Sequence, residues 1–252
     1  MKPILKLTDV NKSFGGVVVA QNVCVELQEG TIHGLIGPNG AGKTTLLNLI
    51  SGIYDVDSGT IEFDGKVITK MPAHQRARLG IGRTFQMPRF LDRSDIEDNL
   101  LLARDLGVKC SFISSFFGKK DKTYIKELEM LTNMADFSYY LEDDVTSLTF
   151  GQRKLLEIIR AILTNPKVIL VDEPAAGLNG AEIEHAVGLL EWAAKEKNIG
   201  IILIEHSMDM IMSVCSSITV LNFGSVIACG TPDEIACNED VITAYLGREN
   251  DA

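Results

Sequence analysis

The chain has 252 residues, of which 46% are hydrophobic and 23% charged, and its formal net charge is −10. This composition is typical of a folded globular protein and excludes a disordered chain. The acidic balance argues against a general nucleic-acid binder, because such a protein needs a basic surface to displace counterions from phosphate.

The cysteines are scattered, at positions 24, 110, 215, 229 and 237, and none forms a C-x-x-C pair. We therefore expect free thiols in a reducing compartment and no structural zinc site. No run approaches the ~20 apolar residues that cross a bilayer, and the first residues do not have the pattern of a signal peptide. A cytoplasmic protein is expected.

The first quarter of the chain is predicted to be mostly strands, separated by glycine-containing turns. The predicted strands are Ile4–Leu7, Val17–Ala20, Val23–Leu27 and Ile32–Ile36, followed later by Thr60–Phe63. A helix with one apolar face is predicted from Lys43 to Ile50.

Between the strand that ends at Ile36 and this helix lies a glycine-rich segment, which reads Gly37-Pro38-Asn39-Gly40-Ala41-Gly42-Lys43-Thr44-Thr45. It matches the pattern G-x-x-x-x-G-K-[ST], in which glycines let backbone N–H groups surround an anion at a helix N-terminus. Lys43 is expected to reach the β- and γ-phosphates, and the Thr44 hydroxyl to bind Mg²⁺. The segment predicts a site for a nucleoside triphosphate.

From about Pro88 to Asn165 the pattern is helical, and residues 166–252 return to alternating strands and helices. The strands expected there are Val168–Val171, Ile201–Ile204 and Ile218–Leu221, with helices near Ala181–Glu196 and Met208–Cys215. This alternation predicts an α/β fold with a mostly parallel sheet. We predict one domain over residues 1–252, with a core formed by 1–87 and 166–252 and a helical lobe, 88–165, inserted between them.

Two carboxylates, Asp172 and Glu173, directly follow the apolar strand Val168–Val171. A strand that is apolar on both faces suits the centre of a parallel sheet, and ligands bind beyond the carboxyl ends of such strands. We expect both carboxylates near the glycine-rich segment. Asp172 is suited to hold Mg²⁺ through its water shell, and Glu173 to accept a proton from an attacking water or to orient it.

A second candidate anion site is the segment Leu148-Thr149-Phe150-Gly151-Gln152, which precedes an apolar helix face that ends at Asn165-Pro166. Thr149 and Gly151 then lie at a helix N-terminus, where anions are favoured. An ordinary N-capped helix without a ligand is the alternative.

The order of the glycine-rich segment, Gln86, Leu148–Gln152, Asp172-Glu173 and His206 resembles the ATP-binding cassette (ABC) ATPases over essentially the whole chain. In that family two subunits enclose two ATP molecules, and the signature segment, here residues 148–152, faces the nucleotide of the opposite subunit. The resemblance implies a mostly parallel core with an N-terminal antiparallel β part. It also implies that Phe14 stacks on adenine, that Gln86 links the γ-phosphate and Mg²⁺ to a membrane partner, and that His206 contacts the γ-phosphate.

Finer detail is similar to the ATPase subunits of bacterial branched-chain amino-acid importers. The segments that carry this similarity are Pro174–Asn179, Ile204–Met208, Gly230–Ile235 and Ala244–Gly247, with an extra stretch, 106–122, similar to the longer of the two paired subunits. The resemblance implies an ATPase with ATP and Mg²⁺ as cofactors and a second ABC ATPase subunit, identical or related, as partner. It further implies permease subunits, an indirect link to a solute-binding protein, no nucleic-acid partner, and a place on the inner face of the cell membrane.

Two residues depart from the family pattern: Phe150 replaces the first glycine of the signature, and Asn179 replaces an aspartate of the loop that crosses the dimer. Beyond Gln86, the residues Met87, Pro88, Phe90 and Leu91 either line a socket for a permease helix or pack within the lobe. The lysines at 119, 120 and 122 either contact a membrane subunit or anionic lipid headgroups, or belong to a solvated loop.

Three other functions compete with amino-acid import. One is an ABC ATPase that acts on DNA or ribosomes, and another is an ABC transport ATPase for a different solute, such as urea or lipopolysaccharide. The third is a phosphotransferase that uses the same phosphate-binding loop, for which the segment 148–152 would have no use.

Overall fold

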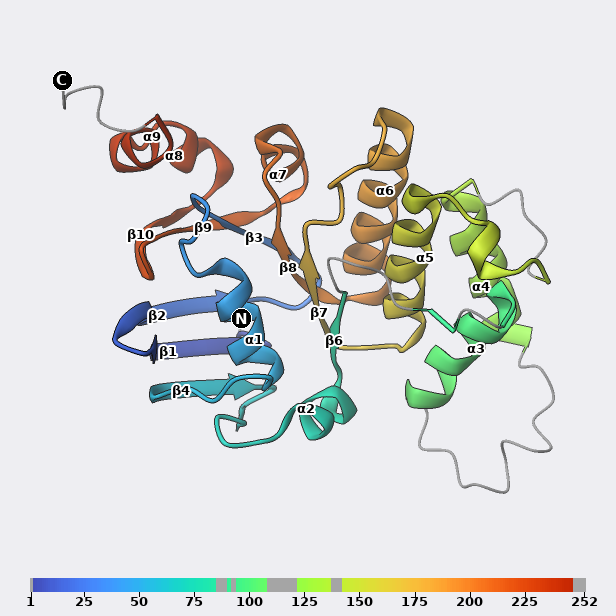
Figure 1. The fold of residues 1–252 in the computed structure, drawn as a ribbon, viewed down its shortest axis with the longest axis horizontal. Coiled ribbons are helices and arrows are strands. Elements are labelled where there is room, and N and C mark those ends of the chain that lie inside the picture. Colours follow the sequence, from blue (N-terminus) through green and yellow to red (C-terminus); the bar gives the residue numbers. More distant parts are fainter. Residues whose placement is uncertain (1, 85–89, 92–93, 108–121, 137–141, 247–252) are drawn as a thin grey trace.

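The computed structural model describes residues 2–84, 90–91, 94–107, 122–136 and 142–246 (Figure 1). Gln86, Met87 and Pro88, together with most of the stretch 106–122, lie outside the described residues. The side chains at 102–107, 122–123 and 246 are likewise not described.

The centre of the molecule is a six-stranded sheet in the order β10-β9-β3-β8-β7-β6. Its strands run parallel except β10, which is antiparallel to β9. The bounds are β3 Ile32–Ile36, β6 Ile81–Arg83, β7 Val168–Asp172, β8 Gly200–Ile204, β9 Ser217–Asn222 and β10 Ser225–Gly230. The predicted parallel sheet is confirmed, and the edge strands β6 and β10 were not expected.

A second sheet, of order β2-β1-β4-β5, is antiparallel throughout. Its strands are β1 Leu5–Phe14, β2 Val17–Leu27, β4 Ser58–Phe63 and β5 Lys66–Val67. The prediction of two strands, Val17–Ala20 and Val23–Leu27, was wrong, because β2 continues through Gln21 and Asn22. Asn22 has a φ of 48° and its N–H donates to the Asn11 side chain at 2.9 Å. The polar residues therefore sit in an irregular stretch of the β1–β2 ladder, and pairing resumes beyond it.

Helices α3, α4, α5 and α6 lie together at one end of the molecule, whereas α1 lies near its middle beside the antiparallel sheet (Figure 1). The longer helices are α1 Lys43–Ser51, α3 Ile96–Gly107, α4 Lys122–Met134, α5 Phe150–Leu163, α6 Gly180–Lys197 and α9 Glu239–Leu246. Shorter ones are α2 Ala73–Leu79, the 3₁₀ turn η1 Val145–Ser147, α7 Met208–Val214 and α8 Pro232–Ala236.

The central strands separate two apolar clusters. Alternate residues of β7 point to opposite sides, so that Ile169 and Val171 join the cluster around α5 and α6, whereas Val168 and Leu170 join the cluster around α1 and the antiparallel sheet. Every residue of β3, β7 and β8 is buried. Burying an aliphatic side chain contributes roughly 1.5–3 kcal/mol to the free energy of folding. Packing against both apolar clusters therefore stabilises the position of the sheet.

A histidine side chain is buried within this sheet. His33 on β3 is 2% exposed, with Nδ1 2.7 Å from the Ser217 hydroxyl and Nε2 2.9 Å from the Thr219 hydroxyl on β9. Burial lowers the pKa of His33 from 6.5 to about 4. The folded protein therefore keeps a neutral imidazole at a pH where the unfolded chain is already protonated.

This difference in pKa makes the stability pH-dependent. Below pH 6.5 the unfolded chain binds a proton that the folded chain does not, so His33 should lower the free energy of unfolding as the pH falls toward 4, by up to about 1.4 kcal/mol per pH unit. Above pH 6.5 it should have no effect. Urea unfolding of the wild type and His33→Asn between pH 7 and 4.5 measures this slope, with the exposed His74→Asn as control. Equal slopes for wild type and His33→Asn would contradict the prediction.

Candidate functional site

The predicted site residues follow three neighbouring parallel strands. The glycine-rich loop follows β3, Asp172 ends β7 with Glu173 next to it, and His206 comes two residues after β8. The order β3-β8-β7 brings these three strand ends to the same edge of the sheet. The loop, the two carboxylates and the histidine are thus brought together, as the sequence predicted.

The loop itself is held by close backbone packing. Gly37 has a φ of 151°, and a Cβ there would overlap the carbonyl oxygen of Leu221. Gly42 has a φ of 104°, caps α1, and would in the same way overlap the carbonyl of Val19. Both positions therefore require glycine, and the loop leads directly into the positively polarised N-terminus of α1.

Lys43 begins α1 and points back into the loop. Its Nζ donates to the carbonyls of Gly37 at 2.6 Å and Pro38 at 3.1 Å. Burial lowers the pKa of this ammonium, while the nearby carboxylates of Glu173 and Asp172 raise it in part. A buried cation inside a ring of backbone groups can stabilise a bound anion strongly, because little water screens it.

Asp172 is 3% exposed and its two oxygens differ in their surroundings. Oδ2 lies 3.7 Å from the Arg83 guanidinium, which also donates to the Asn48 side chain on α1 at 2.6 Å. Oδ1 is buried and, among the described residues, has no hydrogen-bond partner. Burial raises the pKa of Asp172, and the charges of Arg83 and Lys43 and the Thr44 hydroxyl oppose this rise. An unpaired carboxylate oxygen beside Thr44 fits the ligand preference of Mg²⁺.

Glu173 and His206 face each other across the ends of β7 and β8, with Oε1 of the carboxylate 3.1 Å from Nε2 of the imidazole. Glu173 has a φ of 52°, in the left-handed region that is uncommon for glutamate. Its N–H donates to the Ile204 carbonyl at 2.9 Å. Such a conformation persists only where the surroundings hold it, and it is concentrated at functional sites.

Two buried charged residues next to this pair were not predicted to take part. Glu205 is 5% exposed and accepts the N–H of Ala175 at 2.6 Å and that of His206 at 2.8 Å. Lys154, also 5% exposed, donates to the carbonyl of Glu173 at 2.8 Å. The sequence signal for Glu205 was its place between a buried strand and His206, whereas Lys154 lies on a helix face that sequence alone assigns to packing.

The signature segment forms the start of α5. Thr149 is the N-cap, and its hydroxyl accepts the backbone N–H of Gln152 at 3.2 Å. In turn, the side-chain oxygen of Gln152 accepts the backbone N–H of Thr149 at 2.9 Å. The predicted helix N-terminus at Thr149 and Gly151 is therefore present, while Leu148 is buried beneath it. Figure 1 shows α5 well apart from α1 and the phosphate loop. Within one chain, the signature is therefore not brought to the phosphate loop, the glycine-rich segment 37–45.

Phe14 ends β1 and is 42% exposed. Its ring packs edge-to-face on Tyr54, with centroids 5.2 Å apart, and the Lys12 ammonium lies 5.1 Å from its centroid. An exposed aromatic pair of this kind offers a flat surface to a planar ring.

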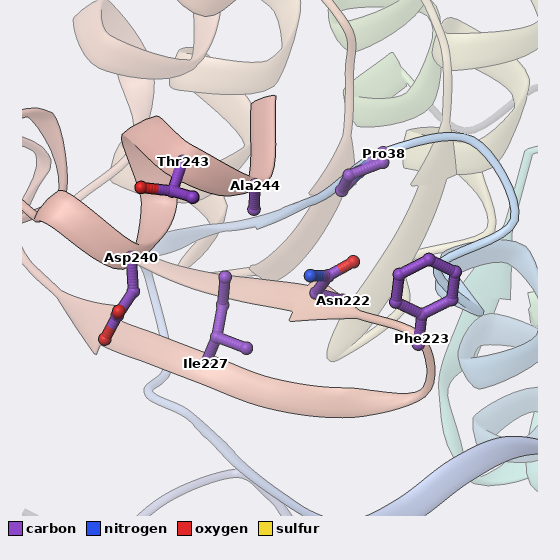
Figure 2. Close-up of a pocket in the computed structure, with 7 residues that line it drawn as sticks. All are labelled: Pro38, Asn222, Phe223, Ile227, Asp240, Thr243 and Ala244. Carbon is purple, nitrogen blue, oxygen red and sulfur yellow. The ribbon is translucent and has the colours of Figure 1, made fainter. Parts of the chain in front are cut away.

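A separate pocket of about 760 Å³ adjoins the phosphate loop only through Pro38 (Figure 2). The β9–β10 hairpin and α9 supply the rest of its lining, which consists of Asn222, Phe223, Ile227, Asp240, Thr243 and Ala244. Of the predicted catalytic and metal-binding residues that the structure describes, none lines it, so it is distinct from the site at the strand ends.

None of the helices in the described ranges combines the length and apolar character that a bilayer crossing requires.

Comparison with known proteins gives two family matches. The model described as ABC transporter matches residues 20–176, more than half of the chain. The model described as branched-chain amino acid ATP-binding cassette transporter matches residues 225–251.

Individual relatives agree with these matches. The high-affinity branched-chain amino acid transport ATP-binding protein BraF of Pseudomonas aeruginosa is 35% identical over 98% of both chains. LivG of Salmonella typhimurium, which carries the same description, is 36% identical over 98% of both. The ribose import ATP-binding protein RbsA of Bacillus licheniformis is also 36% identical, but the match covers only 48% of its length.

Solved structures show the same fold. MJ1267, an ATP-binding cassette of an ABC transporter, superimposes with a TM-score of 0.82 at 30% identity, over 98% of this chain and 100% of the other. Its ADP conformation gives 0.82 at 29% identity with the same coverage. These matches confirm the predicted family, the predicted fold class and the assignment to the transport ATPases. The chain belongs to the ABC transporter family, as one of its ATP-binding cassettes.

Proposed function

We propose that this chain binds and hydrolyses ATP with Mg²⁺ as the cytoplasmic subunit of an importer for branched-chain amino acids. The observation that carries the proposal is the meeting, at one edge of the sheet, of the phosphate loop with Asp172 and the Glu173–His206 pair. This arrangement provides an anion cradle, a cation ligand and a polarised carboxylate within one site.

In this proposal Lys43 and the loop N–H groups neutralise the triphosphate, and Phe14 stacks on adenine. Glu173 accepts the proton of the attacking water or orients it, and His206, 3.1 Å from that carboxylate, contacts the γ-phosphate. Phosphoryl transfer needs positioning and charge stabilisation more than covalent chemistry, and these roles supply both. Gln86, which lies outside the described residues, would contact Mg²⁺ and the membrane partner.

The residues around Asp172 fit a magnesium ion. Its Oδ1 is buried without a hydrogen-bond partner in the described structure, and the Thr44 hydroxyl adjoins the same carboxylate. Thr44 and Asp172 would hold Mg²⁺, which when bound neutralises charge on the phosphate oxygens. Arg83 keeps the other oxygen of Asp172 in place.

A second cassette completes each site in this proposal. The segment 148–152 forms a helix N-terminus with an exposed Phe150, yet it lies apart from its own phosphate loop (Figure 1). We infer that it faces the nucleotide of a partner subunit, identical or related. The pair would drive permease subunits, to which a solute-binding protein delivers the solute. The chain would then lie on the inner face of the membrane through the permease.

The solute is inferred from the relatives. Identity alone does not separate amino-acid from ribose import, because BraF, LivG and RbsA are equally similar within one percentage point. The match covers 98% of BraF but only 48% of RbsA, and residues 225–251 match the branched-chain family model. Both observations favour the branched-chain group. The net charge of −10 argues against the alternative action on DNA or ribosomes.

Glu173→Gln should leave ATP affinity within twofold of wild type and reduce turnover by at least about 100-fold, because the amide cannot take a proton. Phosphate release and equilibrium binding of a fluorescent ATP analogue measure the two quantities. Glu184→Gln, exposed on α6, is the matched control. Turnover close to wild type in Glu173→Gln would remove this residue from catalysis.

Asp172→Asn should weaken Mg²⁺ binding by about tenfold or more, because a neutral amide replaces the charged group of the cation site. The readout is ATP binding titrated with MgCl₂, which does not depend on turnover. The exposed Asp209→Asn on α7 serves as control. If magnesium strengthens ATP binding equally in wild type and Asp172→Asn, the assigned magnesium site is wrong.

Cells that lack this chain should lose uptake of labelled leucine and recover it with wild type but not with Glu173→Gln, since import would need hydrolysis. Competition with isoleucine, valine, urea and ribose defines the solute. If the wild-type chain restored uptake of urea or ribose but not of leucine, the proposed ATPase function would stand and the branched-chain assignment would be refuted.

A further inference from the structure

The start of the signature helix is tied to the loop that carries Glu173. Lys154, one turn after Phe150 on α5, donates its buried ammonium to the carbonyl of Glu173 at 2.8 Å. The Phe150 ring lies 5.5 Å from the same ammonium and covers Gly177, where an added Cβ would come within 3.0 Å of it. Residues i and i+4 share a helix face, so one face of α5 contacts this loop both at Glu173 and at Gly177.

A third contact joins the same two segments. A Cβ on Gly151 would overlap the carboxylate of Glu182, whose oxygen accepts the N–H of Asn179 at 2.9 Å. The Asn179 side chain in turn accepts the Glu182 N–H at 3.0 Å. Of the two departures from the family pattern, Phe150 thus contacts the loop directly, and Asn179 is hydrogen-bonded to the Glu182 that lies against Gly151.

The hydrogen bond from Lys154 supports the backbone conformation of Glu173. The residue has a φ of 52°, and its backbone is held by its own N–H bond to β8 and by the bond from Lys154 to its carbonyl. An unfavourable backbone conformation of this kind costs on the order of 1–3 kcal/mol and relaxes when its supports are removed. Without the ammonium, the Glu173 carboxylate should lose its fixed direction toward His206.

A lysine suits this position because of its charged surroundings. It is 5% exposed and lines a small cavity together with Thr84, Glu157, Asp172 and Glu173. An ammonium there balances the buried carboxylates while directing a hydrogen bond at one carbonyl. A neutral side chain of similar length would leave the carbonyl of Glu173 without this donor.

We propose that Lys154 is a positioning residue that links the signature segment of this chain to Glu173 of its own nucleotide site. The inference rests on the proposed function, in which residues 148–152 contact the nucleotide held by the partner subunit. Movement of the signature on that contact would pass through one hydrogen bond to the backbone carbonyl of Glu173, and from there to its water-orienting carboxylate. Each chain would thereby couple the partner's nucleotide to its own hydrolysis.

The test uses the full chain with Lys154→Met, Lys154→Arg and Lys154→Gln, and with the exposed Lys195→Met on α6 as control. Lys154→Met should lower kcat about tenfold with ATP affinity within twofold of wild type, and change a sigmoidal ATP dependence into a hyperbolic one. Lys154→Arg, which keeps a charged donor, should recover kcat to within about threefold of wild type. Lys195→Met should match wild type in all quantities.

Several outcomes would overturn the inference. They are a kcat within twofold of wild type in Lys154→Met, a parallel loss of ATP affinity, absence of recovery with Lys154→Arg, or a hyperbolic curve for wild type. Should Lys154→Met fail to fold, Lys154→Gln decides the same comparison, because its uncharged amide ends one bond short of the position from which the ammonium reaches the Glu173 carbonyl. It should lower kcat in the same way, and a kcat within twofold of wild type would overturn the inference. Failure of wild type to bind and hydrolyse ATP would instead refute the proposed function itself.

Discussion

The parallel ladder of β3, β8 and β7 is the constraint on which the rest of the structure depends. Its hydrogen bonds fix Asp172 opposite Ile204 and align the end of β3 with both. Every residue of these strands is buried, so a slip of register would expose apolar side chains on one side or the other. The packing of the core therefore fixes where the phosphate loop begins after β3 and where the turns after β7 and β8 begin.

Buried charge at this edge is balanced within a small volume. Lys43, Arg83 and Lys154 lie among the carboxylates Asp172, Glu173, Glu157 and Glu205. Burial lowers the pKa of each of these basic groups, and the neighbouring carboxylates raise it in part. Ions buried in this way gain little net stability, because desolvation opposes their attraction. We interpret the cluster as serving the orientation of groups around a phosphate.

The departures from the family pattern are accommodated by local contacts. Phe150 packs over Gly177, whose φ of 80° and lack of a side chain leave room for the ring. Asn179 caps α6 through its side-chain oxygen, a role that asparagine and aspartate fill about equally well. Both substitutions preserve a tight junction between the signature and the loop after β7.

The sequence by itself determined the phosphate loop, the two carboxylates after a buried strand and the capped start of α5, because each depends on residue types at short spacing. It also determined the parallel sheet, through strands that are apolar on both faces. The division into a core and a lobe at 88–165 stays a prediction. Only the tertiary structure decided that β2 is one strand, that β6 forms an edge, and that Glu205, Arg83 and Lys154 support the site. The three supporting residues act through contacts between positions 19 to 89 apart. Strands β2 and β6 are defined by pairing with β1 and β7, and local patterns encode neither kind of contact.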